Sequence, residues 1–208
     1  MAKTANLLVH GLDRSAGDRA VLLLPLHWLS AVAAMGCWTA GLAVTGSGSA
    51  QVAFAAPDRL REARSTGAEE VVAVSLRPLG GALGGDLPPG ITDYGAEVLG
   101  YGDSFSPSVP LDPATPAFDG QTGAQLVDAA RAAASRWGLG AGDRMLSVLP
   151  FDTLDGWLAG LLAPLVAGGG VVLCRHVDVG ALGGRVVAER VTATAGVAVP
   201  GVRELAAG

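Results

Sequence analysis

An uncharged stretch constrains the fold of this chain more than any other feature. No Asp, Glu, Lys or Arg occurs from Ala20 to Pro57, and residues 21–44 are almost entirely apolar. This run exceeds the roughly 18 residues that mark a candidate membrane span. Pro25 and two glycines interrupt it, which favours separate short elements over one long helix. The expected elements are a buried strand (20–24), a helix (about 27–40) and a second strand (42–45), with a membrane helix as the alternative.

The same pattern occurs a second time. Residues 17–25 read GDRAVLLLP and residues 142–150 read GDRMLSVLP, so Gly-Asp-Arg precedes an aliphatic run and Leu-Pro at equal spacing. Each copy continues through a helical pattern to a glycine stop and another apolar run. Aliphatic strands that alternate with helices are typical of parallel sheets covered on both faces. Because Asp152 and Asp155 fall inside the second apolar stretch, the repeat favours a soluble α/β fold over a membrane span.

The rest of the chain extends this alternation. A Pro-, Ser- and Gly-rich linker at about 100–117 separates two expected pseudo-repeats, 1–105 and 106–208, which can also pack as one compact domain. The other expected elements are strands at 51–55, 71–76 and 192–199, helices at 57–67, 92–99 (capped by Thr92), 122–137 and 180–190, and a short helix after Pro200.

Charge and cysteine usage exclude several classes of partner. The net charge is −5 and no basic run occurs, so we expect neither nucleic acid nor a membrane as a partner. Cys37 and Cys174 lie far apart in apolar sequence, which is typical of reduced core thiols. The first residues lack the basic and apolar regions of a signal peptide. A cytoplasmic protein is therefore expected.

Further motifs surround the second Gly-Asp-Arg. They are a helical stretch before the turn, Leu-Pro at the end of the strand, Gly156 six residues after Pro150, a glycine stop at 167–170, and VTATAGVAVP at 191–200. In this order they resemble the AMP-binding superfamily of acyl-CoA synthetases and adenylation domains, and the first copy is similar to an earlier stretch of those enzymes. The overall pattern most resembles their short, uncharacterised bacterial relatives, which lack the phosphate-binding loop and the C-terminal domain. The resemblance implies two Rossmann-like βα pseudo-repeats with mainly parallel sheets, like the N-terminal part of these enzymes.

The chain departs from the active enzymes where they hold ATP. Those enzymes carry a Ser/Thr/Gly-rich loop ending in Pro-Lys-Gly before the second helix. Here residues 112–126 contain only Gly120, Thr122 and Gly123 as a remnant, and the sole lysine of the chain is Lys3. The family's adenine loop, magnesium-binding Glu, ribose-binding Asp and C-terminal lysine would fall after residue 208.

These departures imply a degenerate, non-catalytic relative that serves as a binding or interaction module, with no cofactor and no catalytic residue. Its partner would be a second copy of the chain or another protein. The alternative is a component of an acid-activating ligase that another polypeptide completes. ATP or AMP would bind only in that case.

One ligand cleft can be proposed from the residues. Asp152, Thr153, Asp155 and Gly156 follow a predicted parallel strand, at the end where open α/β sheets bind ligands. The structural alternative is that Asp152 or Thr153 caps the next helix. His27 holds the equivalent place in the first copy and is interpreted as a residue of the cap region.

Three residues of types that bind zinc occur close together near the end of the second apolar stretch. Cys174, His176 and Asp178 alternate on an expected strand and could all face one side, but no fourth ligand stands out, so no metal site is expected.

Overall fold

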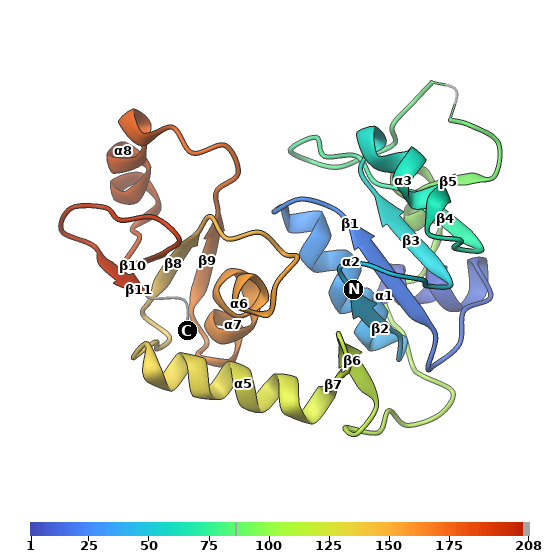
Figure 1. Cartoon of the computed structure of the whole chain (residues 1–208), viewed down its shortest axis with the longest axis horizontal. Helices are drawn as coiled ribbons and strands as arrows, with labels where there is room; N and C mark the ends of the chain where they lie inside the picture. Colours follow the sequence, from blue (N-terminus) through green and yellow to red (C-terminus); the bar gives the residue numbers. More distant parts are fainter. Residues whose placement is uncertain (86, 206–208) are drawn as a thin grey trace. The chain divides into compact units, whose positions relative to one another are not determined.

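The computed structural model describes residues 1–85 and 87–205. Contacts within the chain divide it into two units, Met1–Ala124 and Gln125–Gly208, and each unit has a sheet of its own (Figure 1). This agrees with the predicted α/β fold class. No helix among the described residues has both the length and the apolar character needed to cross a membrane.

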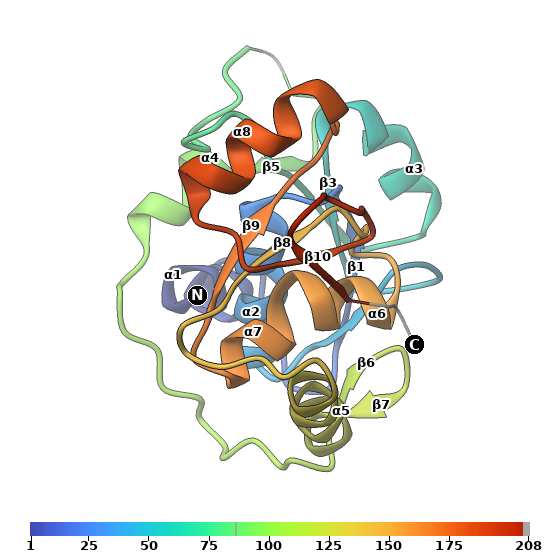
Figure 2. The same cartoon turned by 90° about the vertical axis from the view of Figure 1, so that its left-hand side faces the viewer.

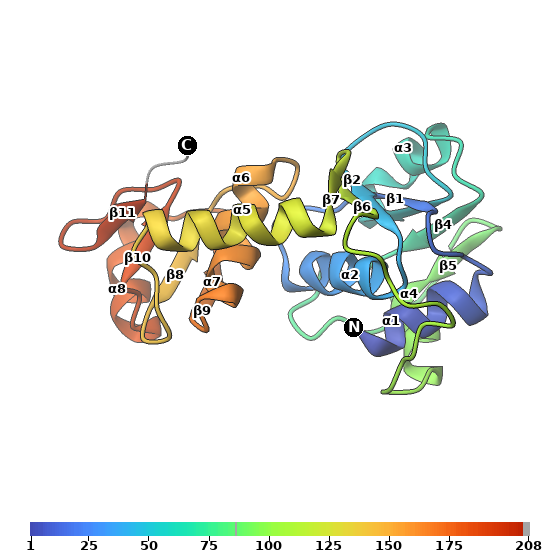
Figure 3. The same cartoon turned by 90° about the horizontal axis from the view of Figure 1, so that it is seen from below.

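The first unit is built on a seven-stranded sheet in the order β5-β4-β3-β1-β2-β6-β7, parallel throughout except for the β6–β7 pair. Figure 3 shows this sheet between α3 on one side and α2 on the other. The strands are β1 (Arg19–Leu23), β2 (Ala43–Thr45), β3 (Val52–Ala55), β4 (Glu70–Ala73), β5 (Ile91–Asp93), β6 (Pro116–Phe118) and β7 (Gln121–Thr122). The helices are α1 (Ala2–Asn6), the π-helical η1 (Leu7–Gly11), α2 (Trp28–Thr39), the 3₁₀ turn η2 (Pro57–Arg59), α3 (Leu60–Ser65), α4 (Tyr94–Glu97) and the 3₁₀ turn η3 (Val98–Gly100).

The uncharged stretch forms the centre of this sheet. Strand β1 pairs in parallel with β2 on one side and β3 on the other, and all four residues of β3 are buried. Small side chains let the helices approach closely. A Cβ on Gly36 of α2 would lie 2.5 Å from the side chain of Thr4 in α1. Burial inside the unit therefore explains the absence of charge from most of residues 20–57.

The second unit contains a four-stranded parallel sheet in the order β11-β10-β8-β9. Figure 2 shows α8 on one face of this sheet and α6 and α7 on the other. The strands are β8 (Arg144–Ser147), β9 (Gly170–Leu173), β10 (Ala193–Ala195) and β11 (Arg203–Leu205). The helices are α5 (Gly123–Arg136), which begins at the junction of the units, α6 (Leu154–Trp157), the π-helical η4 (Leu158–Leu162), α7 (Ala163–Val166) and α8 (Val179–Glu189).

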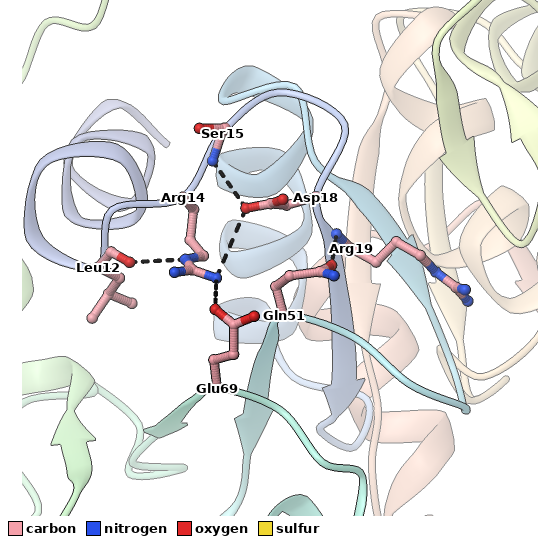
Figure 4. A network of polar contacts seen from close by, with 7 residues as sticks. All are labelled: Leu12, Arg14, Ser15, Asp18, Arg19, Gln51 and Glu69. Carbon is pink, nitrogen blue, oxygen red and sulfur yellow. Dashed lines mark hydrogen bonds and ion pairs between the residues drawn. The ribbon is translucent and has the colours of Figure 1, made fainter.

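An aspartate braces the turn before the central strand of each sheet. In the first unit, Oδ2 of Asp18 accepts the Ser15 N–H at 3.0 Å (Figure 4). In the second, Oδ2 of Asp143 accepts the Gly140 N–H at 2.9 Å. The backbone N–H of each aspartate also donates to the carbonyl of the same partner residue, at 3.1 and 2.9 Å respectively. The two Gly-Asp-Arg turns are thus closed by the same pair of bonds.

The same turns also set the register of the neighbouring strands. The carbonyls of Asp18 and Asp143 accept N–H bonds, each of 2.9 Å, from the first residues of β2 and β9. The side chains of Gln51 and Thr192 accept N–H bonds of 2.8 and 3.0 Å from the first residues of β1 and β8. One turn therefore aligns three strands in each unit.

The negative charge of Asp143 strengthens the hydrogen bonds that close its turn. A hydrogen bond of 2.7 Å from the Thr192 hydroxyl lowers the pKa of this carboxyl, as do the Gly140 N–H and, to a smaller extent, the guanidinium of Arg203. The ionised form is therefore the one that links the turn to β10 and β11.

Two local predictions are wrong. The cap of α4 is Asp93, whose side chain accepts the N–H groups of Gly95 and Ala96, whereas Thr92 lies inside β5. The segment after Pro200 forms strand β11 instead of a helix, because it pairs in parallel with β10.

The division between the units also falls later in the chain than the predicted boundary at 105/106. The reason is the segment before α5, for which the sequence pattern predicts a linker and a loop. It forms β6 and β7, and β6 pairs with β2 in the first sheet.

The packing of α6 gives a stability prediction. A Cβ at Gly156 would lie 1.7 Å from the carbonyl oxygen of Pro150, whereas one at Gly183, a helical glycine of α8, would meet nothing within 4 Å. Gly156→Ala should lower the free energy of unfolding by about 2 kcal/mol or more, because backbone must move. Gly183→Ala should be neutral or stabilising by up to about 1 kcal/mol. Urea unfolding followed by circular dichroism compares the two, and equal midpoints would contradict the packing.

Candidate functional site

The four residues of the predicted cleft lie between the end of β8 and the first turn of α6, and two of them have structural roles. Thr153 caps α6, since its Oγ1 accepts the Gly156 N–H at 3.1 Å. Gly156 is buried against the Pro150 carbonyl. Asp152 is exposed and Asp155 is half-buried in the first turn of α6. The cap supports the structural alternative for Thr153 and leaves the two carboxylates as candidate ligand groups.

Aromatic packing fills the space behind this turn. The rings of Phe151 and Trp157 stack with centroids 4.1 Å apart and an angle of 6° between them. A Cβ on Gly160 would lie 2.5 Å from the Phe151 ring, so the ring rests directly on the helix backbone. Gly160 thus provides room for the Phe151 ring.

His27 occupies the matching place in the first unit and also caps a helix. Its Nδ1 accepts the Leu29 N–H at 3.2 Å at the start of α2. A role for His27 in the cap region agrees with the sequence interpretation.

The three residues considered for zinc are engaged separately. Cys174 is buried and accepts a contact of 3.4 Å from Arg185, while Asp178 caps α8 through the Gly180 N–H. His176 lies beside Arg175, with 2.8 Å between Nε2 and the arginine Nε. Within residues 1–85 and 87–205, no group of three or more His, Cys, Asp or Glu side chains is placed to hold a metal ion.

The segment with the loop remnant folds as a hairpin. Strands β6 and β7 are joined by Asp119 and Gly120, whose φ angles of 43° and 87° are both left-handed. A two-residue hairpin turn of type I′ requires such angles, and Asp-Gly is a preferred pair for it. The Asp119 N–H donates to Val44 at 3.2 Å, and the Thr45 hydroxyl donates to Asp119 Oδ1 at 2.6 Å. The hairpin is therefore tied to β2.

The start of α5 is closed by the same segment. The N–H of Gly123 donates to the Thr115 carbonyl at 3.0 Å, and that of Ala124 donates to the Pro113 carbonyl at 2.8 Å. These are two of the N–H groups that a helix N-terminus would otherwise offer to a phosphate. The remnant residues are thus distributed over a turn (Gly120), a strand (Thr122) and a helix start (Gly123).

A cavity of about 530 Å³ lies beside this hairpin, within the first unit. We name it the β2 cavity. The sequence pointed to neither its position nor its polar lining, although the Asp-Gly pair at 119–120 was a usable hairpin signal. Its polar lining residues are Arg19, Thr45, Ser47, Thr115 and Asp119.

A second cavity of about 560 Å³ lies near the N-terminus of the first unit and is largely apolar. Trp28 and Leu79 line it and are 44% and 93% exposed. Tyr94 lies at its base, where burial raises the pKa of the phenol, and its hydroxyl bonds to Thr4 at 2.8 Å. The amine of Lys3 contacts the Tyr101 carbonyl and lies 3.4 Å from Asp103.

Comparison with known proteins places the chain in a family. No protein-family model matches it. A TIGR03089 family protein of Mycobacterium tuberculosis (strain ATCC 25618 / H37Rv) is 36% identical over 197 residues, which cover 92% of this chain and 79% of the relative. The chain belongs to the TIGR03089 family.

Solved structures share the fold of this chain. The acyl-CoA synthetase of Brucella canis matches with a TM-score of 0.75 and 17% identity, over 94% of this chain and 40% of the enzyme. The anthranilate CoA ligase AuaEII, solved with anthranoyl-AMP, matches with a TM-score of 0.75 and 14% identity, over 93% of this chain and 43% of the ligase. MbtA of Mycobacterium smegmatis matches with a TM-score of 0.73 and 26% identity, over 93% of this chain and 41% of MbtA. The chain thus spans about two fifths of these structures, and its resemblance to the AMP-binding superfamily is confirmed at the level of the fold.

A pair of substitutions tests the structural role of the turn after β8. Thr153→Ala should lower the free energy of unfolding by about 1 kcal/mol, because the Gly156 N–H loses its acceptor. Asp152→Ala removes an exposed side chain and should change it by less than about 0.5 kcal/mol. Urea titrations of both variants provide the measurement. A larger loss for Asp152→Ala than for Thr153→Ala would show that the cap has been misassigned.

Proposed function

We propose that this protein is a non-catalytic relative of the AMP-binding enzymes that acts as a binding or interaction module. The observation that carries the proposal is the closed start of α5. The N–H groups of Gly123 and Ala124 already donate to carbonyls of the chain, and a two-residue turn replaces a loop. A nucleotide phosphate at this position would have to displace those bonds, so the residues present do not fit ATP.

The charges of the segment support the same proposal. Transfer of phosphoryl or nucleotidyl groups depends on placed positive charge and metal ions. Residues 112–126 contain no Lys or Arg, and they contain Asp112 and Asp119, which would repel phosphate. Lys3 is engaged with Tyr101 and Asp103. The protein therefore keeps the α/β framework without the charges that adenylation needs.

The proposed partner is a second copy of the chain or another cytoplasmic protein, and no nucleotide cofactor is part of the proposal. Asp152 and Asp155 remain candidate ligand groups in the second unit, at the end of β8 where parallel sheets bind ligands.

A second candidate function is a component of an acid-activating ligase. The extent of the match supports it, because 94% of the chain superposes on the fold of an acyl-CoA synthetase. Another polypeptide would then supply the remaining catalytic groups. Acid-dependent exchange of pyrophosphate into ATP, by this chain mixed with proteins encoded beside its gene, would support this candidate; consistent absence of exchange would count against it.

Isothermal titration of the protein with ATP and Mg²⁺ tests the first proposal. We expect no saturable heat, because the N–H groups of Gly123 and Ala124 are already bonded and residues 112–126 contain no Lys or Arg. An acyl-CoA synthetase titrated in the same buffer serves as the positive control. A micromolar dissociation constant for this protein would contradict the proposal.

A further inference from the structure

The β2 cavity lies over a part of the first sheet where polar side chains face the same way. In the parallel register, Arg19 pairs with Ala43 and Val21 pairs with Thr45. Since side chains alternate along a strand, Arg19 and Thr45 lie on one face. Thr45 is 4% exposed and forms part of the floor, and Ser47 and Thr115 add hydroxyl groups. The cavity is therefore built by one unit alone, and several polar side chains line it.

Arg19 brings a positive charge to this cavity. Its side chain points away from the network of Arg14, Asp18 and Glu69, as Figure 4 shows. Among the described residues, no carboxylate lies within 4.0 Å of its guanidinium. Arg144, at the matching position of the second unit, pairs with Glu189 at 3.1 Å. The difference leaves the Arg19 guanidinium able to bind a ligand.

Asp119 brings a negative charge to the same cavity. Its Oδ1 accepts the Thr45 hydroxyl, while Oδ2 has no hydrogen-bond partner among residues 1–85 and 87–205. The hairpin turn and the bond from its N–H to Val44 fix the backbone at this residue. Asp119 and Arg19 do not form an ion pair within 4.0 Å, so each can form hydrogen bonds of its own with a ligand.

We infer that the β2 cavity binds a small zwitterion, with the carboxylate of the ligand on Arg19 and its ammonium group on Asp119. A ligand with one charge would leave the other protein charge unpaired, whereas a zwitterion satisfies both. The cavity volume of about 530 Å³ falls within the usual range for small-molecule sites. This inference rests on the proposed binding role and names the ligand class for one site.

Backbone amide shifts in ¹⁵N-labelled protein test this inference. The probes are ω-amino acids of increasing length, from glycine to 6-aminohexanoate, with butyrate and butylamine as singly charged analogues. At least one zwitterion should shift the amides of Arg19, Ser47 and Gly120 in a saturable way. Butyrate and butylamine should bind about tenfold more weakly or worse, because each lacks one charged hydrogen bond.

Three variants identify the site. Arg19→Gln and Asp119→Asn should each weaken binding of the best zwitterion about tenfold or more. Asparagine tolerates the left-handed turn and can still accept the Thr45 hydroxyl, so the hairpin should persist. Arg61→Gln, on the exposed face of α3, is the matched control and should bind as the parent does.

Two results would overturn the inference. One is the absence of saturable shifts at the cavity with every zwitterion, and the other is equal binding by all three variants, each checked for folding by its amide spectrum. Neither result bears on the titration with ATP, which tests the proposed function separately.

Discussion

The aspartate of each Gly-Asp-Arg turn is the constraint on which both sheets depend. Its carboxylate and its N–H both bond to the residue three positions earlier, and its carbonyl accepts the first N–H of the next parallel strand. The central strand that follows is paired on both sides and buried, so an error in its start would shift every side chain to the opposite face. A short polar turn at the edge of the sheet thus positions an apolar interior that contains no charge of its own.

Much of this fold could be predicted from sequence because the signals are local. The two Gly-Asp-Arg turns, the aliphatic strands and the glycine stops gave β1, α2, β2 and their counterparts in the second unit to within a few residues. Two of the failures involve short strands that form only beside a partner strand. The stretch after Pro200 forms a strand because β10 lies beside it, and the linker before α5 contributes β6 because β2 offers an edge. Short strands of this kind are determined by tertiary pairing more than by their own residues.

The candidate sites were harder to predict for the same reason. The cap by Thr153 is local and was among the alternatives drawn from the sequence. The β2 cavity joins Arg19 to Asp119, which are distant in sequence, and no motif connects them. The solved ligases share the α/β framework. In this chain, however, backbone groups of the segment before α5 form the β6–β7 hairpin and accept the N–H groups at the helix start. Retention of the fold and the proposed loss of phosphate binding are therefore compatible, since different residues determine the strands and the loop.

Amide hydrogen exchange at the start of α5 tests this account most directly, because the account depends on whether those N–H groups are engaged. The amides of Gly123 and Ala124 donate to Thr115 and Pro113. They should exchange slowly in the free protein, and their rates should not change when ATP and Mg²⁺ are added. Rapid exchange that slows on addition of ATP and Mg²⁺ would show that the helix start is open and binds phosphate, and it would contradict the account.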